Sequence, residues 1–258
     1  FLGNMSLYTI LDAFTWHFYY GPGSHKPHPL VEANFTQPSI LDRFLSSALE
    51  VIQLCQDNED VVRELWVGET SSTYGGGTAN LSSSYVAGFL WLDKLGIAAN
   101  TQQKIVCRQV FAHSYYSVIN NQNRPNPDFW TSLLWKRLVG NRVWEVKNGL
   151  EYGRSVRAYA FSTYRYDGAV TVVLLNTSSN IQKVEFITDN DPDIKIMSVY
   201  ILTSSHLGSS DMLLNGELLE IDHYGQLPPL KGKVIPCWDV RMPPKSYGFV
   251  VLQNAHVT

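Results

Sequence analysis

The sequence of 258 residues has no long basic run, and its formal net charge at pH 7 is −3. Proteins that bind nucleic acid usually carry a basic patch or stripe, so nucleic acid is not expected as a partner. No apolar run approaches the roughly 20 residues that a membrane-spanning helix needs. We therefore expect no transmembrane segment.

Cysteine is scarce, with only Cys55, Cys107 and Cys237. The three are widely spaced and form no metal-binding pattern, and their odd number leaves at least one unpaired within the chain. Cys55 and Cys107 have apolar neighbours in the sequence, which favours core thiols. No spaced cluster of His and Cys is present, so no metal site is expected.

Several catalytic motifs are also missing. The sequence has no Gly-x-Ser-x-Gly nucleophile elbow, although the residue types for Ser-His-Asp or Cys-His chemistry all occur. A phosphate cradle at Gly75–Gly77 is disfavoured, because no Lys-Ser or Lys-Thr follows these glycines. The chain begins Phe1-Leu2-Gly3-Asn4, with neither Met nor a signal-peptide pattern, which we interpret as a cut inside a larger protein.

Four Asn-x-Ser/Thr sequons are present, at Asn4, Asn34, Asn80 and Asn176. Each pattern occurs often by chance, but four together favour a secretory route with glycosylation at these positions. We therefore expect a secreted, extracellular-matrix or lysosomal protein.

Hydrophobic residues make up 45% of the chain, enough for a substantial core. In the first part, strand-like and helix-like patterns alternate three times, which is typical of a β/α barrel. Ser82 is expected to cap the second helix and Gly96 to end it, while Asp128 is expected to cap the third. The expected strands are 13–19, 65–67 and 104–108, and the expected helices are 38–54, 82–96 and 128–139.

After about Arg142 the pattern changes to short β-like runs, which predict a β-sandwich. Asn215-Gly216, between two leucine-containing runs, is a strong two-residue hairpin signal. The predicted fold class is α/β plus all-β, with residues 1–142 as the C-terminal part of a (β/α)₈ TIM barrel and residues 143–258 as the sandwich. Three β/α units cannot close an eight-stranded barrel, so the missing units are expected to precede Phe1 or to lie on a companion chain.

The stretch Leu65–Gly77 carries the strongest functional signal. A short apolar run ends in Glu69, and then come small hydroxyl residues, Tyr74 and three glycines. In a barrel, catalytic side chains lie at the carboxyl ends of strands. Glycines let backbone amides approach a ligand closely. The alternative is a strand that ends in a solvated Glu and a flexible turn.

This stretch resembles the nucleophile segment of heparanase-type endo-β-glucuronidases, the family of retaining glycoside hydrolases that includes heparanases and leech-type hyaluronidases. Further matching segments follow in the family's order and cover nearly the whole chain. They are Thr15–Tyr20, Ala87–Gly96, Arg108–Phe111, Pro127–Trp130 and the end Tyr247–Val251.

The resemblance implies roles for individual residues. Glu69 would be the nucleophile and His17 would orient it, whereas Tyr19, Tyr74, Gly75, Gly76, Gln109 and Tyr116 would bind substrate. Tyr115 remains an alternative to Tyr116, because the chain is one residue shorter there. His17 and Tyr19 could instead be structural residues of the barrel rim, and Arg108 is expected to be structural. No metal or organic cofactor is implied.

Retaining glycosidases need a second carboxyl group, about 5–5.5 Å from the nucleophile. In the family this acid/base is a Glu that follows an Asn on an earlier strand, and no segment here matches that strand. We therefore expect the acid/base to lie outside this chain, in an upstream half of the barrel, and this chain alone to be inactive.

The sequence thus predicts a retaining endo-β-glucuronidase that cleaves a glycosaminoglycan, with heparan sulfate favoured. One alternative is a hyaluronan-cleaving relative, and another is a glycan-binding protein or truncated product without catalysis. The loop 21–29 follows a strand and carries His25, Lys26 and His28, so it could favour a sulfated chain; a solvated variable loop is the competing interpretation.

Overall fold

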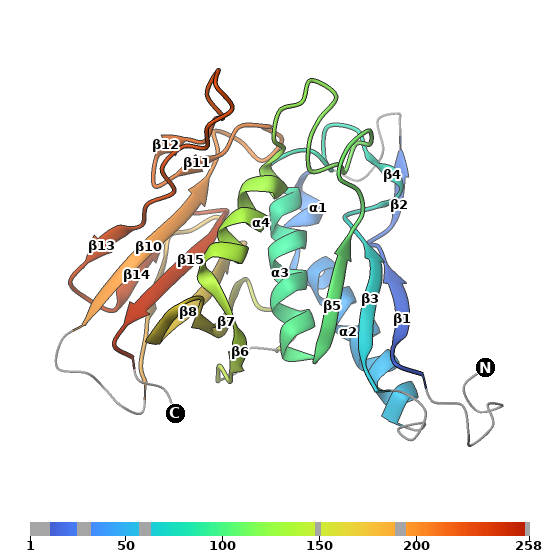
Figure 1. Ribbon diagram of the computed structural model, residues 1–258, viewed down its shortest axis with the longest axis horizontal. Coiled ribbons are helices and arrows are strands. Elements are labelled where there is room, and N and C mark those ends of the chain that lie inside the picture. Colours follow the sequence, from blue (N-terminus) through green and yellow to red (C-terminus); the bar gives the residue numbers. More distant parts are fainter. Residues whose placement is uncertain (1–10, 25–31, 57–62, 148–150, 189–194, 256–258) are drawn as a thin grey trace.

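The computed structural model describes residues 11–24, 32–56, 63–147, 151–188 and 195–255. The cationic loop residues His25, Lys26 and His28, and the sequon at Asn4, lie outside these ranges. In Figure 1 the described chain has three layers: a parallel sheet, a layer of helices, and a large antiparallel sheet.

The parallel sheet contains β1 (Phe14–Phe18), β3 (Leu65–Thr70) and β5 (Gln103–Arg108), in the order β1-β3-β5. Helix α2 (Pro38–Gln56) connects the first pair of strands, and α3 (Ala87–Asn100) connects the second. Helix α4 (Pro127–Leu138) follows β5. The predicted alternation of strand and helix is thus confirmed in this part of the chain.

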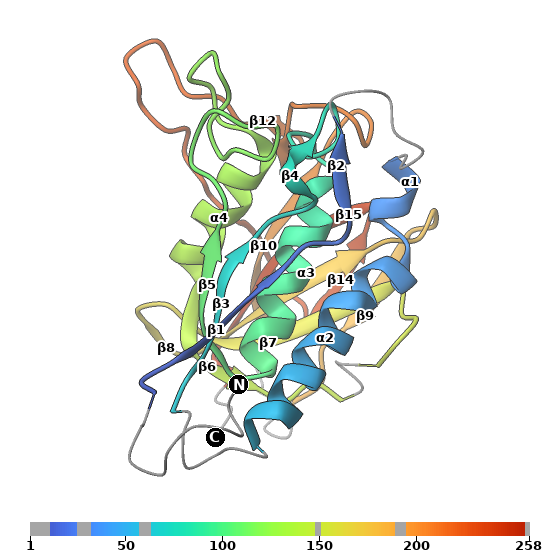
Figure 2. The same ribbon diagram turned by 90° about the vertical axis from the view of Figure 1, so that its right-hand side faces the viewer.

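Two short elements extend the carboxyl end of this sheet. Strand β2 (Pro22–Ser24) follows β1 and pairs in parallel with β4 (Tyr74–Thr78), which follows β3. The single turn α1 (Glu32–Phe35) precedes α2. Figures 1 and 2 show β2, β4 and the loop after β5 gathered at the end toward which β1, β3 and β5 point.

The second sheet has eight antiparallel strands. The main path runs β12-β11-β10-β15-β8-β7-β6, and β13 pairs with β10. A separate antiparallel pair, β9 (Gln182–Glu185) and β14 (Asp239–Met242), packs on one face. The bounds are β6 Val139–Trp144, β7 Val156–Thr163, β8 Tyr166–Asn176, β10 Ile196–Thr203, β11 Leu213–Leu214, β12 Glu217–Leu218, β13 Lys233–Ile235 and β15 Ser246–Gln253.

The hairpin prediction at Asn215-Gly216 is confirmed. Leu214 pairs with Glu217 across the turn, and both central residues have positive φ, 53° and 92°. This is the backbone that a two-residue type I′ turn requires. Strand β6 spans the boundary expected between residues 142 and 143, and a division into two domains there stays a proposal.

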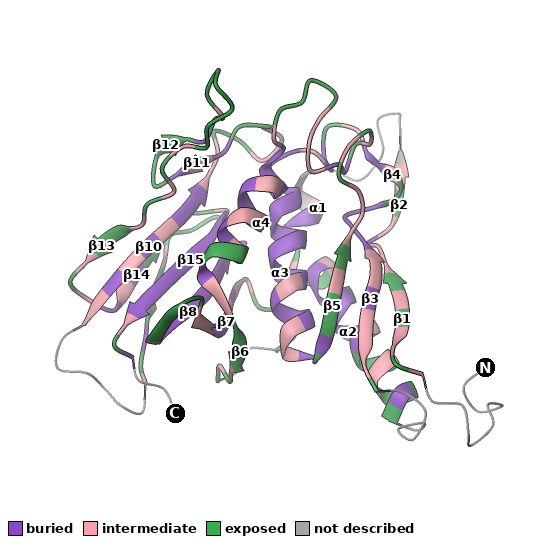
Figure 3. Ribbon diagram, in the orientation of Figure 1, coloured by how far each residue is buried: buried purple, intermediate pink, exposed green. Residues whose placement is uncertain are grey.

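Helix α3 is packed on both sides. It contacts β5 of the parallel sheet as well as β7 and β8 of the antiparallel sheet, so apolar side chains occupy nearly its whole circumference. One hydrophobic core therefore runs from β3 through α3 to β15. Figure 3 shows α3 mostly buried, whereas β1 and β5 are partly exposed.

Two polar residues of α3, Asp93 and Lys94, are fully buried in this core. Asp93 lies 3.3 Å from the guanidinium of Arg157 on β7 and accepts a 2.7 Å hydrogen bond from Tyr159. Arg157 also pairs with Asp42 of α2. This ion cluster ties α2 and α3 to the antiparallel sheet.

Three details of the helices differ from the sequence prediction. Helix α3 begins after Val86 and not after Ser82, whose hydroxyl instead accepts a 2.8 Å hydrogen bond from the Thr78 backbone N–H. Gly96 lies inside α3, where a Cβ would come within 2.2 Å of the Tyr159 ring, so this glycine serves close packing and does not end the helix. The N-cap of α4 is Asn126, while Asp128 in its first turn binds Arg108.

The prediction that Cys107 is a core thiol is wrong, because Cys107 is exposed. It lies on β5, where Ile105 is also exposed, whereas Val106 between them packs against the core. The same alternation exposes Thr15 and His17 on β1. One face of the parallel sheet is therefore open, although parallel sheets are normally covered on both faces.

Candidate active site

Glu69 stands at the carboxyl end of β3, on the middle strand of the parallel sheet, where it pairs with His17 of β1. Its side chain is 35% exposed, so the carboxylate is reachable while partly screened from water. In the open sheet a ligand could approach this end from the exposed face. Catalytic side chains of a β/α barrel lie at the carboxyl ends of its strands, and Glu69 has such a position.

Tyr19 directly contacts the carboxylate. Its hydroxyl donates a 2.5 Å hydrogen bond to Oε1 of Glu69. Burial, and next this hydrogen bond, raise the pKa of the Tyr19 hydroxyl well above its usual value. The raised pKa keeps the Tyr19 hydroxyl protonated as a donor near neutral pH, and the hydrogen bond fixes the orientation of the carboxylate.

His17 lies farther away, with its Nδ1 3.9 Å from Oε2 of Glu69. That distance is too long for a hydrogen bond. Among the residues that the structure describes, no group donates a hydrogen bond to Oε2, so this oxygen is free to react. Sequence reasoning assigned the orienting role to His17, and the geometry gives Tyr19 the direct contact.

Tyr19 also anchors an aromatic cluster beside Glu69. Its ring stacks on Tyr116 with centroids 6.2 Å apart and meets Tyr74 edge-on at 6.4 Å. Tyr116 is 6% exposed, whereas Tyr74 is 54% exposed. The structure therefore brings together three of the tyrosines expected to bind substrate, and Tyr74 is the one that faces solvent. Tyr115, the alternative to Tyr116, is 38% exposed.

The glycine loop borders this cluster. Gly75, Gly76 and Gly77 all have positive φ, of 77°, 95° and 91°, which other residues rarely adopt. A Cβ at Gly77 would meet the Tyr116 backbone nitrogen at 2.8 Å, while nothing lies within 4 Å of one at Gly75. The Ser114 hydroxyl and the Tyr115 N–H both donate to the carbonyl of Gly76, at 2.6 and 2.9 Å, and fix the loop.

Gln109 follows β5, and its backbone N–H donates to the Thr70 carbonyl at 2.9 Å, next to Glu69 in the chain. The preceding Arg108 is structural. It binds Asp128 and the Tyr116 carbonyl, each at 2.7 Å, and the Ser71 hydroxyl at 2.6 Å. The strand ends of β3 and β5 are thus tied together behind the candidate site.

Sequence reasoning missed Lys94. Its ammonium donates hydrogen bonds of 2.6 Å to the Thr70 hydroxyl and to the Ser71 carbonyl, the two residues after Glu69. The available signal was an Asp-Lys pair inside a helix that is apolar on every face. Such charges must be buried, and buried charges need specific partners.

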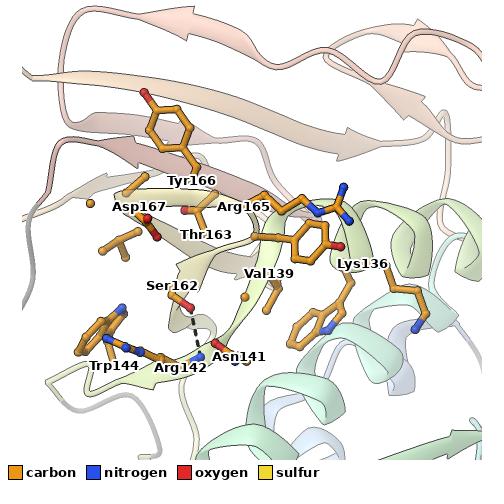
Figure 4. A pocket seen from close by; sticks show the side chains of 16 residues that line it. Lys136, Val139, Asn141, Arg142, Trp144, Ser162, Thr163, Arg165, Tyr166 and Asp167 are labelled. Carbon is orange, nitrogen blue, oxygen red and sulfur yellow. Dashed lines mark hydrogen bonds between the residues drawn. The ribbon is translucent and has the colours of Figure 1, made fainter.

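Of two cavities in the described part of the chain, one borders the candidate site and the other lies apart from it. One of about 460 Å³ lies beside the glycine loop and is bordered by Gly76, His113, Ser114, Tyr115 and Asn120. The other, about 660 Å³, lies between the end of α4, β6 and the β7–β8 turn (Figure 4). Its lining includes Lys136, Arg142, Trp144, Arg165 and Tyr166, and none of the residues expected at the catalytic site.

The sequons differ in their surroundings. Asn80 is exposed, and Asn34 is half-buried. Asn176 is fully buried, and its amide donates to the carbonyls of Asn180, Met242 and Pro243. The expectation of glycosylation at Asn176 is therefore corrected, because an attached glycan would need this amide at the surface.

In the described part of the chain, no three His, Cys, Asp or Glu side chains gather as a metal site would require. No helix there is long and apolar enough to cross a membrane. All three cysteines are free.

The fold has been seen before in glycoside hydrolases. The GH51 α-L-arabinofuranosidase of Thermotoga petrophila RKU-1 superposes with a TM-score of 0.66 at 12% identity, over 94% of this chain and 53% of that one. This likeness shows that the chain has a fold found in TIM-barrel glycoside hydrolases.

Sequence comparison identifies the family of glycoside hydrolases that the chain resembles. Residues 2–96 match the family model "Glycosyl hydrolase family 79, N-terminal domain". The chain is 35% identical to the heparanase of Bos taurus over 96% of this chain and 46% of that protein. It is 33% identical to the hyaluronoglucuronidase of Hirudo nipponia, over 96% and 51% respectively. It is 31% identical to the inactive heparanase-2 of Homo sapiens, over 95% and 44%.

The chain belongs to the heparanase-type family of glycosyl hydrolases, family 79. It spans about half the length of the curated relatives that it matches. Because these relatives include a protein named as inactive, family membership alone does not assign an activity.

Proposed function

We propose that this chain forms the nucleophile-bearing part of a retaining endo-β-glucuronidase that cleaves glycosaminoglycan chains. One observation carries the proposal: the Glu69 carboxylate stands at a strand end beside a loop of three glycines, with Oε1 held by Tyr19 and with no hydrogen-bond donor to Oε2 among the described residues. A fixed, partly exposed carboxylate with one free oxygen is the arrangement that a nucleophile requires.

In this proposal, Oε2 of Glu69 attacks the anomeric carbon and the bond to the leaving sugar oxygen breaks. A glycosyl-enzyme ester results. Water then attacks the same carbon and gives its proton to the acid/base carboxylate, Glu69 leaves as a carboxylate, and the configuration is retained. The proton for the leaving oxygen comes from an acid/base Glu outside this chain, on the upstream half of the barrel or on a companion chain.

The glycine loop and the tyrosines would bind the substrate. Backbone N–H groups of Gly75 and Gly76 and the hydroxyl of Tyr74 suit the carboxylate of a glucuronate, because anions are bound well by such donors. Gln109 would reach the sugar hydroxyls. The loop stays approachable because, among the described residues, nothing lies within 4 Å of a Cβ at Gly75 and only the Ser114 hydroxyl lies near one at Gly76.

Among glycosaminoglycans, heparan sulfate is our first candidate and hyaluronan the second. The heparanase and hyaluronoglucuronidase relatives have similar identities, 35% and 33%, and support both. The exposed sequon at Asn80 fits a secreted or lysosomal glycoprotein, and we propose that location.

The test uses the protein with its upstream half restored. Products from heparan sulfate and from hyaluronan are analysed by size and by the configuration at the new reducing end. Glu69→Gln keeps the shape of the side chain but loses its charge, so it should lose nearly all turnover while retaining glycan binding. Substantial activity in Glu69→Gln, or inverted products, would show that the nucleophile is not Glu69.

A further inference from the structure

Lys94 is an unusual residue in this fold, because its side chain is fully buried and forms no ion pair with a carboxylate of the described residues. It is 0% exposed on α3, in the middle of the core that joins the two sheets. In the described part of the chain, its Nζ has no acidic oxygen within 4 Å. Burial of such a group costs stability, and most proteins avoid it.

The contacts of Lys94 converge on one place, the chain just beyond Glu69. Its Nζ donates to the Thr70 hydroxyl and to the Ser71 carbonyl, both at 2.6 Å. The Thr70 hydroxyl in turn donates to the Phe18 carbonyl at the end of β1. Lys94 therefore joins the end of β3, which carries Glu69, to the end of β1, which Tyr19 directly follows.

The rest of the Lys94 head group is enclosed by aromatic rings. The ring of Tyr20 lies 4.7 Å away, that of Phe18 5.5 Å and that of Phe44 5.8 Å. Aromatic faces within about 6 Å stabilise an ammonium group. Burial, and next the nearby charge of Arg108, lower the pKa of Lys94 well below its usual value, while Asp128 and Asp93 oppose this shift.

A second cation, the mostly buried Arg108, also contacts this turn. Arg108 donates to the Ser71 hydroxyl at 2.6 Å, while Lys94 holds the Ser71 carbonyl. Residues 70 and 71 are thus held through both backbone and side chains. Little freedom remains for the backbone that places Glu69.

We infer that Lys94 is a positioning residue for the proposed nucleophile: from within the core, it fixes the backbone of Thr70 and Ser71 so that the Glu69 carboxylate meets the hydroxyl of Tyr19 and the substrate. The inference rests on the proposed role of Glu69. A residue kept for packing alone would be better replaced by an apolar side chain, since a buried charged group is often less stable than a hydrophobic one of similar volume.

The variant Lys94→Met keeps the length of the side chain but loses its hydrogen-bond donors. A packing role alone predicts an unchanged kcat, whereas the positioning role predicts a lower one. In the protein with its upstream half, kcat should fall by about 10- to 100-fold, because a misplacement of about 1 Å has effects of that size. KM should change less than about threefold, since binding groups are untouched. The melting temperature should stay the same or rise.

Lys136→Met on α4 is the matched control, because Lys136 is exposed and lies on none of the three strands. It should leave kcat and KM unchanged. Thr70→Val removes the hydroxyl that links Lys94 to Phe18 at nearly constant volume, and it should lower kcat by about 10-fold. The double variant should be little worse than Lys94→Met alone, because coupled residues are not additive.

Wild-type kcat in Lys94→Met would overturn the inference, whatever happens to its stability. If Lys94→Met does not fold, Thr70→Val decides, and wild-type kcat in that folded variant would equally overturn it. Glu69→Gln, measured in parallel, separates the two proposals. Full activity there refutes the proposed nucleophile, whereas an inactive Glu69→Gln beside an active Lys94→Met refutes only the role of Lys94.

Discussion

At the scale of single residues, the hydrogen bond from Tyr19 to Glu69 is the contact most closely tied to the proposed chemistry. It links the chain just after β1 to the end of β3, and within the described ranges the second carboxylate oxygen of Glu69 accepts no hydrogen bond. A hydrogen bond to a charged group contributes about 1.5–3 kcal/mol. Tyr19 therefore orients the Glu69 carboxylate and stabilises its negative charge.

We expect Tyr19→Phe to lower kcat by about 10-fold or more, because the carboxylate loses the donor that orients it and small misplacements of a reacting group cost this much. The stacking on Tyr116 survives, since the ring is retained. Steady-state kinetics on a soluble glucuronide substrate would measure the change.

Tyr74→Phe provides the matched control for Tyr19→Phe. Tyr74 is exposed and makes no hydrogen bond to Glu69 in the described structure. Loss of the Tyr74 hydroxyl should therefore raise KM and leave kcat nearly unchanged. Equal effects of the two substitutions on kcat would contradict the distinct roles assigned here.

The limits of sequence reasoning are visible at this site. Glu69, Tyr74 and the three glycines follow each other in one motif, so their identities were available from the sequence. The partners Lys94 and Thr70 are 24 residues apart. Their contact arises only when α3 packs behind β3, and no local pattern encodes that approach.

At the scale of elements, the cluster of Arg157, Asp42, Asp93 and Tyr159 joins α2 and α3 to the antiparallel sheet. Arg157 is the only cation of this cluster, and it is 4% exposed. Removal of one partner from a buried ion pair leaves an uncompensated charge, which costs about 3–5 kcal/mol.

Arg157→Met should therefore destabilise the protein by about 3–5 kcal/mol at neutral pH. Arg154→Met is the control, because Arg154 pairs with Glu151 at an exposed site where the effect should stay below about 1 kcal/mol. Urea unfolding of both variants would measure the difference. A similar loss in the two variants would contradict the importance of the buried cluster.

The loss in Arg157→Met should depend on pH. Burial raises the pKa of Asp93 above its unfolded value, and the charge of Arg157 opposes this rise. Without Arg157 the folded pKa is higher still, so the native state binds more protons than the unfolded state over a wider range. The destabilisation should thus be largest near neutral pH and shrink as the pH falls toward about 4. A penalty that grows in acid would contradict this sign.

Element types could largely be predicted from sequence, while their ends could not. The alternation of strands and helices and the Asn215-Gly216 hairpin follow from local periodicity and turn chemistry. Gly96 was expected to end α3 but lies within it, and the ring of Tyr159 packs where its side chain would be. That constraint comes from a strand more than 60 residues away.

At the scale of the whole molecule, the open face of the parallel sheet is the main feature that needs a partner. Strands β1 and β5 lie at the edges of a three-stranded sheet, and one face exposes Ile105, Cys107 and His17. Unpaired edges and uncovered faces of parallel strands favour association with further chain. The burial pattern thus supports the proposed barrel with an upstream half.

We expect this chain alone to be poorly soluble and without hydrolytic activity. Co-expression with the upstream half should give a soluble complex that hydrolyses the polymer. Gel filtration combined with product analysis would measure both properties. Clear hydrolysis by the isolated chain would contradict the proposal that the acid/base lies elsewhere.

The most direct test of the account is to trap the glycosyl-enzyme intermediate. The protein with its upstream half would be treated with an activated 2-deoxy-2-fluoro-β-glucuronide, whose fluorine slows hydrolysis of the covalent intermediate. Peptide mass spectrometry should then find one sugar attached to Glu69, and Glu69→Gln should remain unlabelled. A label on another carboxylate would contradict the central claim, as would continued turnover with no covalent adduct.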